Sequence, residues 1–101
     1  MTNCEIKEKI RDRVSDEEVL DNIIVLEGDE YADGAIGLTE DNRLVYSYDR
    51  LVKSLARAYN KDNPEQGKND AIDWLEYNTL RAIPYLERAG FLAPVIIHEF
   101  N

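Results

Sequence analysis

Apolar residues recur at every fourth position near the start of the chain. This spacing predicts an amphipathic helix that Asn3 would cap, with inward positions at Ile6, Ile10 and Val14. Ser15 followed by Glu18 is typical of a capping box, so we expect a second, short helix to begin there.

Several later stretches have the composition of strands. The run 23–26 is continuous and β-branched, which favours a buried strand, with the end of a helix as the alternative for so short a run. Residues 27–34 are mostly polar and predict a loop. Alternating apolar positions in 35–48, interrupted by the polar triplet 40–42, predict a hairpin with a short turn. Residues 95–100 predict a final strand that includes Phe100.

Two further helices follow the hairpin. Asp49 is a good N-cap, and the helix after it would turn inward Leu51, Val52, Leu55 and Tyr59. Residues 60–69 are polar and contain Pro and Gly, which indicates a flexible loop. Residues 70–82 predict the last long helix, which Pro84 should kink or end before one more turn closed by Gly90.

These elements predict a single domain over residues 1–101, of the α+β class. We expect a small antiparallel sheet of three or four strands, including the hairpin, with two to four helices packed on it. The length of 101 residues fits one domain, because a single core typically organises about 100–150 residues.

Composition favours a globular protein of a reducing compartment. Hydrophobic residues make up 44% of the chain and charged residues 33%. No apolar run approaches the roughly 20 residues that span a bilayer, and residues 1–13 are too charged for a signal peptide. Cys4 is the only cysteine, so no internal disulfide can form, which favours a cytoplasmic location.

The formal net charge of −9 is concentrated between Val14 and Asn42, where there is no Lys or Arg. Such an excess would repel nucleic-acid phosphates and anionic membranes, which argues against binding either directly. It is explained either by a solvated surface that keeps the protein soluble or by a patch that docks on a basic protein surface. The candidate partner-binding residues are Asp16, Glu17, Glu18, Asp21, Glu27, Asp29, Glu30, Asp33, Glu40 and Asp41.

Two longer blocks resemble a known group of proteins. The first is GLTEDNRLVYSYDRLV at 37–52, and the second is DWLEYNTLRAIPY at 73–85, followed by APVI at 93–96. Together they resemble a group of small acidic hypothetical proteins of bacterial and phage genomes, over about residues 23–97. The resemblance implies a shared fold and a mobile-element origin, and it implies no reaction.

One acidic stretch matches part of a calcium-binding loop. Asp29, Asp33 and Glu40 fall at the first, fifth and twelfth positions, with Gly34 at the sixth. Tyr31 at the third position is a poor ligand, and the flanks are typical of strands rather than helices. Chance acidic spacing is therefore the better interpretation, and we expect no metal and no cofactor.

Residues 76–81 bring a carboxylate, a phenol, an amide, a hydroxyl and a guanidinium onto one helix. In a functional interpretation Arg81 would hold a carboxylate or phosphate. In the structural interpretation, which we favour, Asn78 and Arg81 bond to backbone groups freed near Pro84.

The remaining candidates for chemistry are isolated. His98 is the only histidine, and no spacing pairs it with Cys4 or with a serine as a zinc site or a nucleophile requires. We expect a packed or edge histidine, an inert thiol and no enzymatic activity. The six tyrosines, two phenylalanines and one tryptophan are either core or interface, which the sequence does not decide.

The leading hypothesis is a non-enzymatic protein-binding module that presents the acidic surface to a basic partner. The module itself would be either a monomer or a homodimer. In its strongest form it is a phage or mobile-element inhibitor that occupies a nucleic-acid channel, as anti-CRISPR and anti-restriction DNA mimics do. The alternative is a self-associating structural or assembly protein that uses the hairpin edge and the aromatics. A small enzyme built around Arg81 is the third hypothesis.

Overall fold

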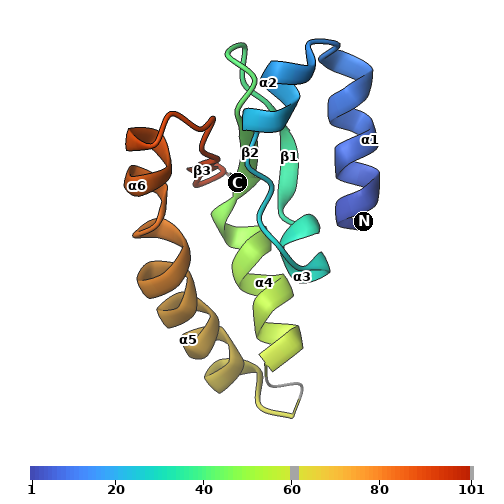
Figure 1. Ribbon diagram of the computed structural model, residues 1–101. Helices are drawn as coiled ribbons and strands as arrows, with labels where there is room; N and C mark the ends of the chain where they lie inside the picture. The colour runs from blue at the N-terminus through green and yellow to red at the C-terminus, as the bar shows by residue number, and fades with distance from the viewer. Residues whose placement is uncertain (60–61, 101) are drawn as a thin grey trace.

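The computed structural model of the protein describes residues 1–59 and 62–100. Helices α1 and α2 lie at one end of the molecule, and α4 and α5 lie side by side towards the other (Figure 1). None of the described helices is long and apolar enough to cross a membrane. In chain order the elements are α1 (Asn3–Arg13), α2 (Glu17–Asn22), α3 (Asp29–Ala32), β1 (Ala35–Leu38), β2 (Leu44–Ser47), α4 (Tyr48–Tyr59), α5 (Pro64–Trp74), the π-helix η1 (Leu75–Leu80), α6 (Ile83–Arg88) and β3 (Val95–Ile97).

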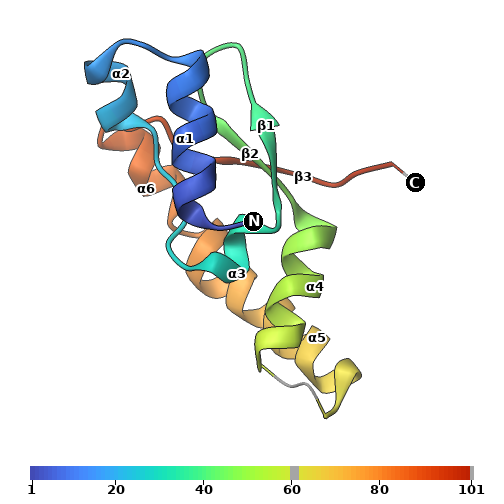
Figure 2. The same cartoon turned by 90° about the vertical axis from the view of Figure 1, so that its right-hand side faces the viewer.

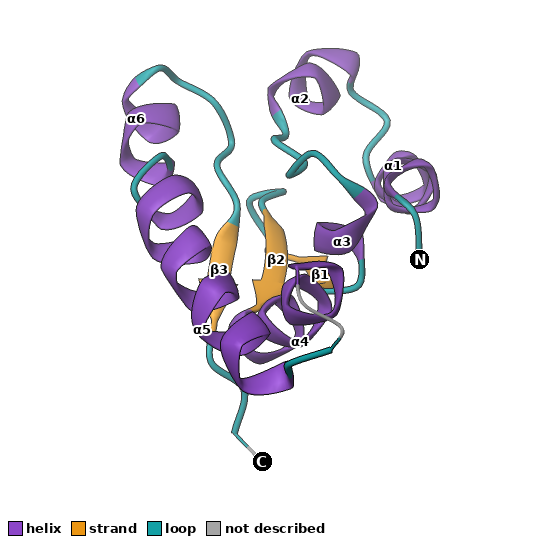
Figure 3. Ribbon diagram, turned by 90° about the horizontal axis from the view of Figure 1, so that it is seen from below, coloured by secondary structure: helices purple, strands orange, loops and turns teal. Residues whose placement is uncertain are grey.

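The described strands form a mixed sheet in the order β1-β2-β3, which confirms the α+β class. β1 and β2 pair antiparallel, as the predicted hairpin requires. β3 instead runs parallel to β2, so the expectation of a wholly antiparallel sheet is wrong. The reason is the long helical connection from α4 to α6, which returns the chain to the end of the sheet where β2 began. α1 lies beyond β1, and α6 lies on the β3 side (Figure 3).

The predicted turn at 40–42 is present. Thr39 N–H donates to the carbonyl oxygen of Arg43 at 2.8 Å, and Asn42 N–H donates to that of Thr39 at 3.0 Å. Asn42 has φ of 65°, a left-handed conformation that asparagine tolerates better than most residues. Asn42 therefore supplies the left-handed conformation at this turn from the local sequence.

Helices begin close to the expected positions, but with different caps. Thr2 rather than Asn3 caps α1, because its hydroxyl accepts from Glu5 N–H. Asp16 rather than Ser15 caps α2, since its carboxylate accepts from Glu18 N–H at 2.9 Å. α4 begins at Tyr48, which places the expected cap Asp49 inside its first turn. A neighbouring polar residue with the right reach replaced the predicted one in α1 and α2.

The strand predicted at 23–26 is absent. Only an isolated bridge joins Ile23 to Leu92, supported by a 3.1 Å bond from Ile24 N–H to the carbonyl oxygen of Leu92. Leu26 N–H donates instead to the phenol oxygen of Tyr46, at 3.0 Å. The apolar side chains of this run are still half or fully buried. The N–H groups of Ile24 and Leu26 therefore have separate partners, and the run forms no strand ladder.

The polar segment expected at 60–69 is mostly helix. α5 begins at Pro64, which suits a first helical turn, and Asn63 caps it by accepting from Gln66 N–H at 3.2 Å. Residues 60 and 61 of the predicted flexible loop lie outside the described residues. α5 then continues into η1, so this helical rod starts earlier than the apolar pattern of 70–82 suggested.

The end of the chain follows the prediction in part. The helical rod breaks just before α6, with Pro84 in the first turn of that helix, and Gly90 follows with φ of 88°. β3 stops at Ile97, and Phe100 projects into solvent beyond it. The extension of the final strand to Phe100 was therefore wrong. The tail leads away from the body of the molecule (Figure 2).

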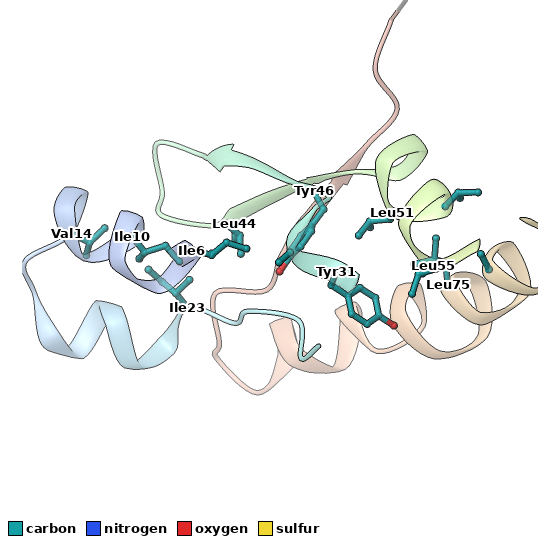
Figure 4. Close-up of a cluster of buried hydrophobic side chains, with 13 residues drawn as sticks. Ile6, Ile10, Val14, Ile23, Tyr31, Leu44, Tyr46, Leu51, Leu55 and Leu75 are labelled. Carbon is teal, nitrogen blue, oxygen red and sulfur yellow. The ribbon is translucent and has the colours of Figure 1, made fainter. Parts of the chain in front are cut away.

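The core runs the length of the molecule (Figure 4). At one end, Ile6 and Ile10 of α1 and its C-cap Val14 face Ile23 and Leu44, as their spacing predicted. The centre is Tyr46, which is fully buried and carries a hydrogen-bonded hydroxyl. The other end is built from α4, α5 and η1, with buried Leu51, Leu55, Ala71 and Leu75.

Candidate functional site

The candidate acidic residues are exposed, except Glu30, which is partly buried, and they lie on separate elements. Those of α2 and of the hairpin turn lie at the same end of the molecule in two perpendicular views (Figures 1 and 2). We call this group the acidic end: Asp16, Glu17, Glu18, Asp21, Glu40 and Asp41. The other four candidates, Glu27, Asp29, Glu30 and Asp33, lie in α3 or directly beside it in the chain, so the ten candidates do not form one continuous set.

Several of these carboxylates have structural roles inside the chain. Asp16 caps α2, and Asp41 accepts a hydrogen bond from the Thr39 hydroxyl. Asp29 accepts from Asn3 N–H at 3.1 Å, and Asp33 lies 3.0 Å from the amino group of Met1. The pKa of that amino group is raised by this contact with Asp33. Asp29 and Asp33 therefore stabilise the position of α1 as well as adding negative charge.

A groove of about 340 Å³ separates part of the acidic end from α1. Its lining includes Glu17 and Asp21 from α2 and Lys7 and Arg11 from α1. No ion pair joins these groups in the described part of the chain. The two cations nevertheless reduce the negative potential along this flank of α2.

The partial calcium register does not assemble into a site. Tyr31 is buried in α3, while Glu40 lies beyond β1 in the hairpin turn. Asp29 and Asp33 are held by contacts with residues at the start of the chain. Within residues 1–59 and 62–100, no group of three or more His, Cys, Asp or Glu side chains is arranged to hold a metal ion.

The polar block 76–81 forms η1 and the turn after it. Thr79 is buried, and its hydroxyl lies 3.3 Å from the phenol oxygen of Tyr31. The guanidinium of Arg81 lies 5.2 Å from the ring centroid of Tyr77, and Asn78 is exposed. In the described chain, neither Asn78 nor Arg81 bonds to backbone groups near Pro84, so that structural expectation was wrong.

His98 and Cys4 are both exposed. The His98 ring packs against Tyr48 with 4.5 Å between centroids and a tilt of 39°. The pKa of Tyr48 is raised, chiefly by partial burial and also by the charges of Glu76 and Asp49. His98 therefore has an edge position with a packing role.

The aromatic residues divide between core and surface. Tyr46 and Tyr31 are buried, whereas Tyr59, Trp74, Tyr77 and Tyr85 are exposed. Three of the exposed rings line an open hollow of about 390 Å³ between the end of α4 and the outer face of α5 and η1. We call it the aromatic hollow, and its lining is Tyr59, Asp70, Asp73, Trp74, Tyr77 and Asn78.

No local sequence pattern predicted this hollow as a unit. The spacing of Asp70, Asp73, Trp74 and Tyr77 places them on one helical face, a signal that was present but unused. Tyr59 was expected to point inward, yet it is 44% exposed at the end of α4. The pairing of Tyr59 with Trp74 depends on how α4 packs against α5, which spacing alone does not show.

No protein family, curated protein or solved structure matches this chain. The resemblance of blocks 37–52 and 73–85 to small acidic bacterial and phage proteins therefore stays a prediction from the residues themselves.

Proposed function

We propose that the protein is a non-enzymatic protein-binding module that docks on a basic surface of its partner through the acidic end. The observation that carries the proposal is the exposure of Glu17, Glu18, Asp21 and Glu40, none of which forms an ion pair within the described chain. Unpaired carboxylates at one end retain their attraction for an approaching cationic surface, which speeds the encounter and orients it.

The acidic end is a better target for mutation than α3. Asp29 and Asp33 contact Asn3 and Met1, so reversing their charge would also disturb α1. Glu17, Glu18 and Asp21 lie on one short helix, and no described contact ties their side chains to another element. Their replacement therefore leaves the described hydrogen bonds and ion pairs of the chain in place.

The test is a tagged pull-down from bacterial lysate with wild-type protein and a triple variant, Glu17→Lys, Glu18→Lys and Asp21→Lys. A matched control carries Asp49→Lys, Asp62→Lys and Glu65→Lys, which makes the same change in net charge on exposed acids outside the acidic end. We expect wild type and control to capture the same basic proteins, and the α2 variant to lose them. Equal capture by all three proteins contradicts the proposal.

Two further arms of that experiment define the partner. Capture through exposed charges should weaken as salt rises, because the interaction is screened beyond about 10 Å at 0.1 M salt. If the partner surface normally holds nucleic acid, excess duplex DNA should displace the protein, which would support the inhibitor form of the proposal. If DNA displaces nothing while the α2 variant still loses capture, the partner is basic but the nucleic-acid form is wrong.

Self-association is the second candidate, and the open edge of the sheet favours it. β1 is an outer strand, Ile36 on it is 39% exposed, and a groove of about 500 Å³ lies between this strand and α1. Such an edge can pair with a second strand. Sedimentation at low and high salt should then show a salt-tolerant dimer that Ile36→Lys abolishes. A monomer under both conditions removes this candidate.

A further inference from the structure

The aromatic hollow combines two chemical features on one exposed surface. It presents the rings of Tyr59, Trp74 and Tyr77 together with the carboxylates of Asp70 and Asp73. It lies where α4 and α5 run side by side, which is distant from α2 (Figures 1 and 3). It is therefore a surface separate from the acidic end.

Its rings are held in place although they are accessible. Trp74 Nε1 donates to Tyr31 Oη at 2.5 Å, and the indole is still 43% exposed. Tyr31 Oη in turn lies 3.3 Å from the buried hydroxyl of Thr79. The ring of Tyr59 meets Trp74 edge-on, with centroids 6.0 Å apart and an angle of 67°. The two rings thus form a corner whose geometry is set before anything binds.

The charge around this corner is negative. Asp73 has no ion-pair partner in the described part of the chain, and Asp70 accepts only from Gln66 Nε2, at 2.9 Å. Glu30 lies near Tyr59, whose pKa is raised chiefly by partial burial and further by Tyr31 and Glu30. The guanidinium of Arg81, which is outside the residues lining the hollow, lies 5.2 Å from the ring centroid of Tyr77. That contact shows that a guanidinium fits against this ring.

Rings and carboxylates together select one kind of ligand group. An ammonium or guanidinium is attracted to the face of an aromatic ring within about 6 Å, and a nearby carboxylate neutralises it. The aliphatic stem of a lysine or arginine packs on the same rings while its charged head stays at the rim. An anionic or neutral group gains neither the attraction of a cation to the ring face nor the neutralisation by a carboxylate.

We propose that the aromatic hollow receives a lysine or arginine side chain from a basic segment of a protein partner. This proposal rests on the proposed function, because the hollow and the acidic end would bind the same basic partner. The two contacts use different surfaces of the protein. A second copy of this chain fits the hollow poorly as occupant, since two molecules of net charge −9 repel each other. The hollow would contribute specificity for a particular side chain, while the acidic end would contribute the long-range attraction.

The test uses short peptides as probes, so that it can fail independently of the acidic end. The peptide Gly-Gly-Lys-Gly-Gly and its arginine and glutamine analogues, all N-acetylated and C-amidated so that only the central side chain can carry a charge, are titrated into ¹⁵N-labelled full-length protein at constant ionic strength. The indole N–H of Trp74 gives a single resonance within the hollow, because Trp74 is the only tryptophan. We expect saturable shifts at Trp74, Tyr59 and Asp73 with the lysine and arginine peptides and none with the glutamine peptide.

Variants then assign the interaction to its parts. Tyr77→Leu keeps an apolar side chain at an exposed position but removes the ring, and Asp73→Asn removes one charge. Each substitution should weaken the binding of the lysine and arginine peptides by about fivefold, which is the scale of one exposed cation–ring or ion-pair contact. Glu17→Gln makes the same charge change on the acidic end and should leave peptide affinity unchanged. The dispersion of the amide spectrum confirms that each variant is folded.

The outcomes separate the two proposals. Equal weakening by Asp73→Asn and Glu17→Gln, shifts confined to α2, or equal binding of the glutamine peptide overturns the hollow as a cation receptor and leaves the acidic end untouched. If the lysine and arginine peptides bind specifically while the α2 variant captures the same lysate proteins as wild type, the hollow is supported as a cation receptor and the proposed function is contradicted. If the resonance of Trp74 shifts with rising protein concentration in the absence of peptide, a second copy of the chain occupies the hollow, and the proposal is also overturned.

Discussion

The indole Nε1 of Trp74 donates a hydrogen bond to the phenol oxygen of Tyr31, with 2.5 Å between the two atoms. The bond joins an exposed ring on the outer face of α5 to a buried side chain of α3, a segment 43 residues earlier. The surface position of Trp74 therefore depends on the core. A change in the buried residue should be detectable at the surface.

Tyr31→Phe tests this dependence. The substitution removes the acceptor of the Trp74 N–H and the partner of the buried Thr79 hydroxyl. We expect the free energy of unfolding to fall by about 1–2 kcal/mol, the usual result of leaving a buried polar group unpaired. Urea unfolding followed by far-UV circular dichroism gives this value, and the fluorescence anisotropy of Trp74 should fall as the ring gains freedom.

Tyr77→Phe is the matched control for that variant. Its side chain is 65% exposed, and its ring contacts Arg81 through the face rather than the hydroxyl. Loss of this hydroxyl should change stability by less than about 0.5 kcal/mol. If both variants lose the same stability, or if neither alters Trp74, the bond to Tyr31 does not orient the indole.

Gly34 and Gly37 should respond in opposite ways to alanine. A Cβ at Gly34 would lie 2.5 Å from Cδ2 of Leu51, which is fully buried and has little room to move, so Gly34→Ala should cost about 1–3 kcal/mol. A Cβ at Gly37 meets nothing within 4 Å, and Gly37→Ala should be neutral or slightly stabilising. Thermal unfolding of both variants measures the difference. Similar melting temperatures would mean that α4 does not pack against Gly34 as described.

Stability should fall in alkaline solution because of Tyr46. Burial raises the pKa of its phenol from 10.0 to about 12, although the bond from Leu26 N–H lowers it in part. The folded protein keeps this proton at a pH where the unfolded chain releases it. The protonated phenol of Tyr46 therefore contributes fully to the free energy of unfolding below pH 10. Between pH 10 and 12 this contribution, about 2–3 kcal/mol, is lost. Tyr48 and Tyr59, whose pKa values are also raised, act in the same direction.

Urea unfolding at several pH values from 8 to 12 checks this prediction, with Tyr46→Phe as the comparison. The variant should be less stable at neutral pH by about 1–2 kcal/mol, because Leu26 N–H loses its acceptor. Its stability should then depend less on pH in the alkaline range. An unchanged alkaline slope would show that other groups cause the loss.

Arg43 connects the hairpin to the end of α6 and the start of β3. Its Nε donates to the carbonyl oxygen of Ala93 at 2.8 Å, and its Nη2 lies 2.8 Å from Oε1 of Glu87. Arg43→Lys should cost about 1–2 kcal/mol, because an ammonium cannot make both bonds in this plane. Glu87→Gln should cost less than about 0.5 kcal/mol, since that ion pair is largely exposed. Chemical denaturation of both variants tests this ranking, and a larger effect of Glu87→Gln would reverse it.

The elements that the sequence predicted well are those specified by their own residues. The turn 40–42 has Asn42 where a left-handed conformation is required. The stripe of Leu51, Val52 and Leu55 is buried as its spacing indicated. The short β3 also lies where its apolar run was found. In each case neighbouring residues carry the signal, because turn chemistry and periodic burial act over a few positions.

The tertiary structure decided what depends on distant partners. The run 23–26 has the composition of a strand, but none of the described strands pairs with it, and Tyr46 and Leu92 accept from two of its N–H groups instead. Tyr31 lies in a stretch that is mostly acidic, yet it is buried because α3 packs against α4. Neither result is contained in local periodicity, since a backbone bond or a covered side chain needs a particular neighbour.

The candidate site divides in the same way. Composition and position along the chain were enough to predict an acidic, solvent-exposed α2, because charged side chains remain hydrated wherever the helix lies. The separation of α2 from α3, and the meeting of Tyr59 with Trp74, came only from the packing of helices. Burial of apolar surface fixes how those helices pack, and that burial depends on the whole chain at once.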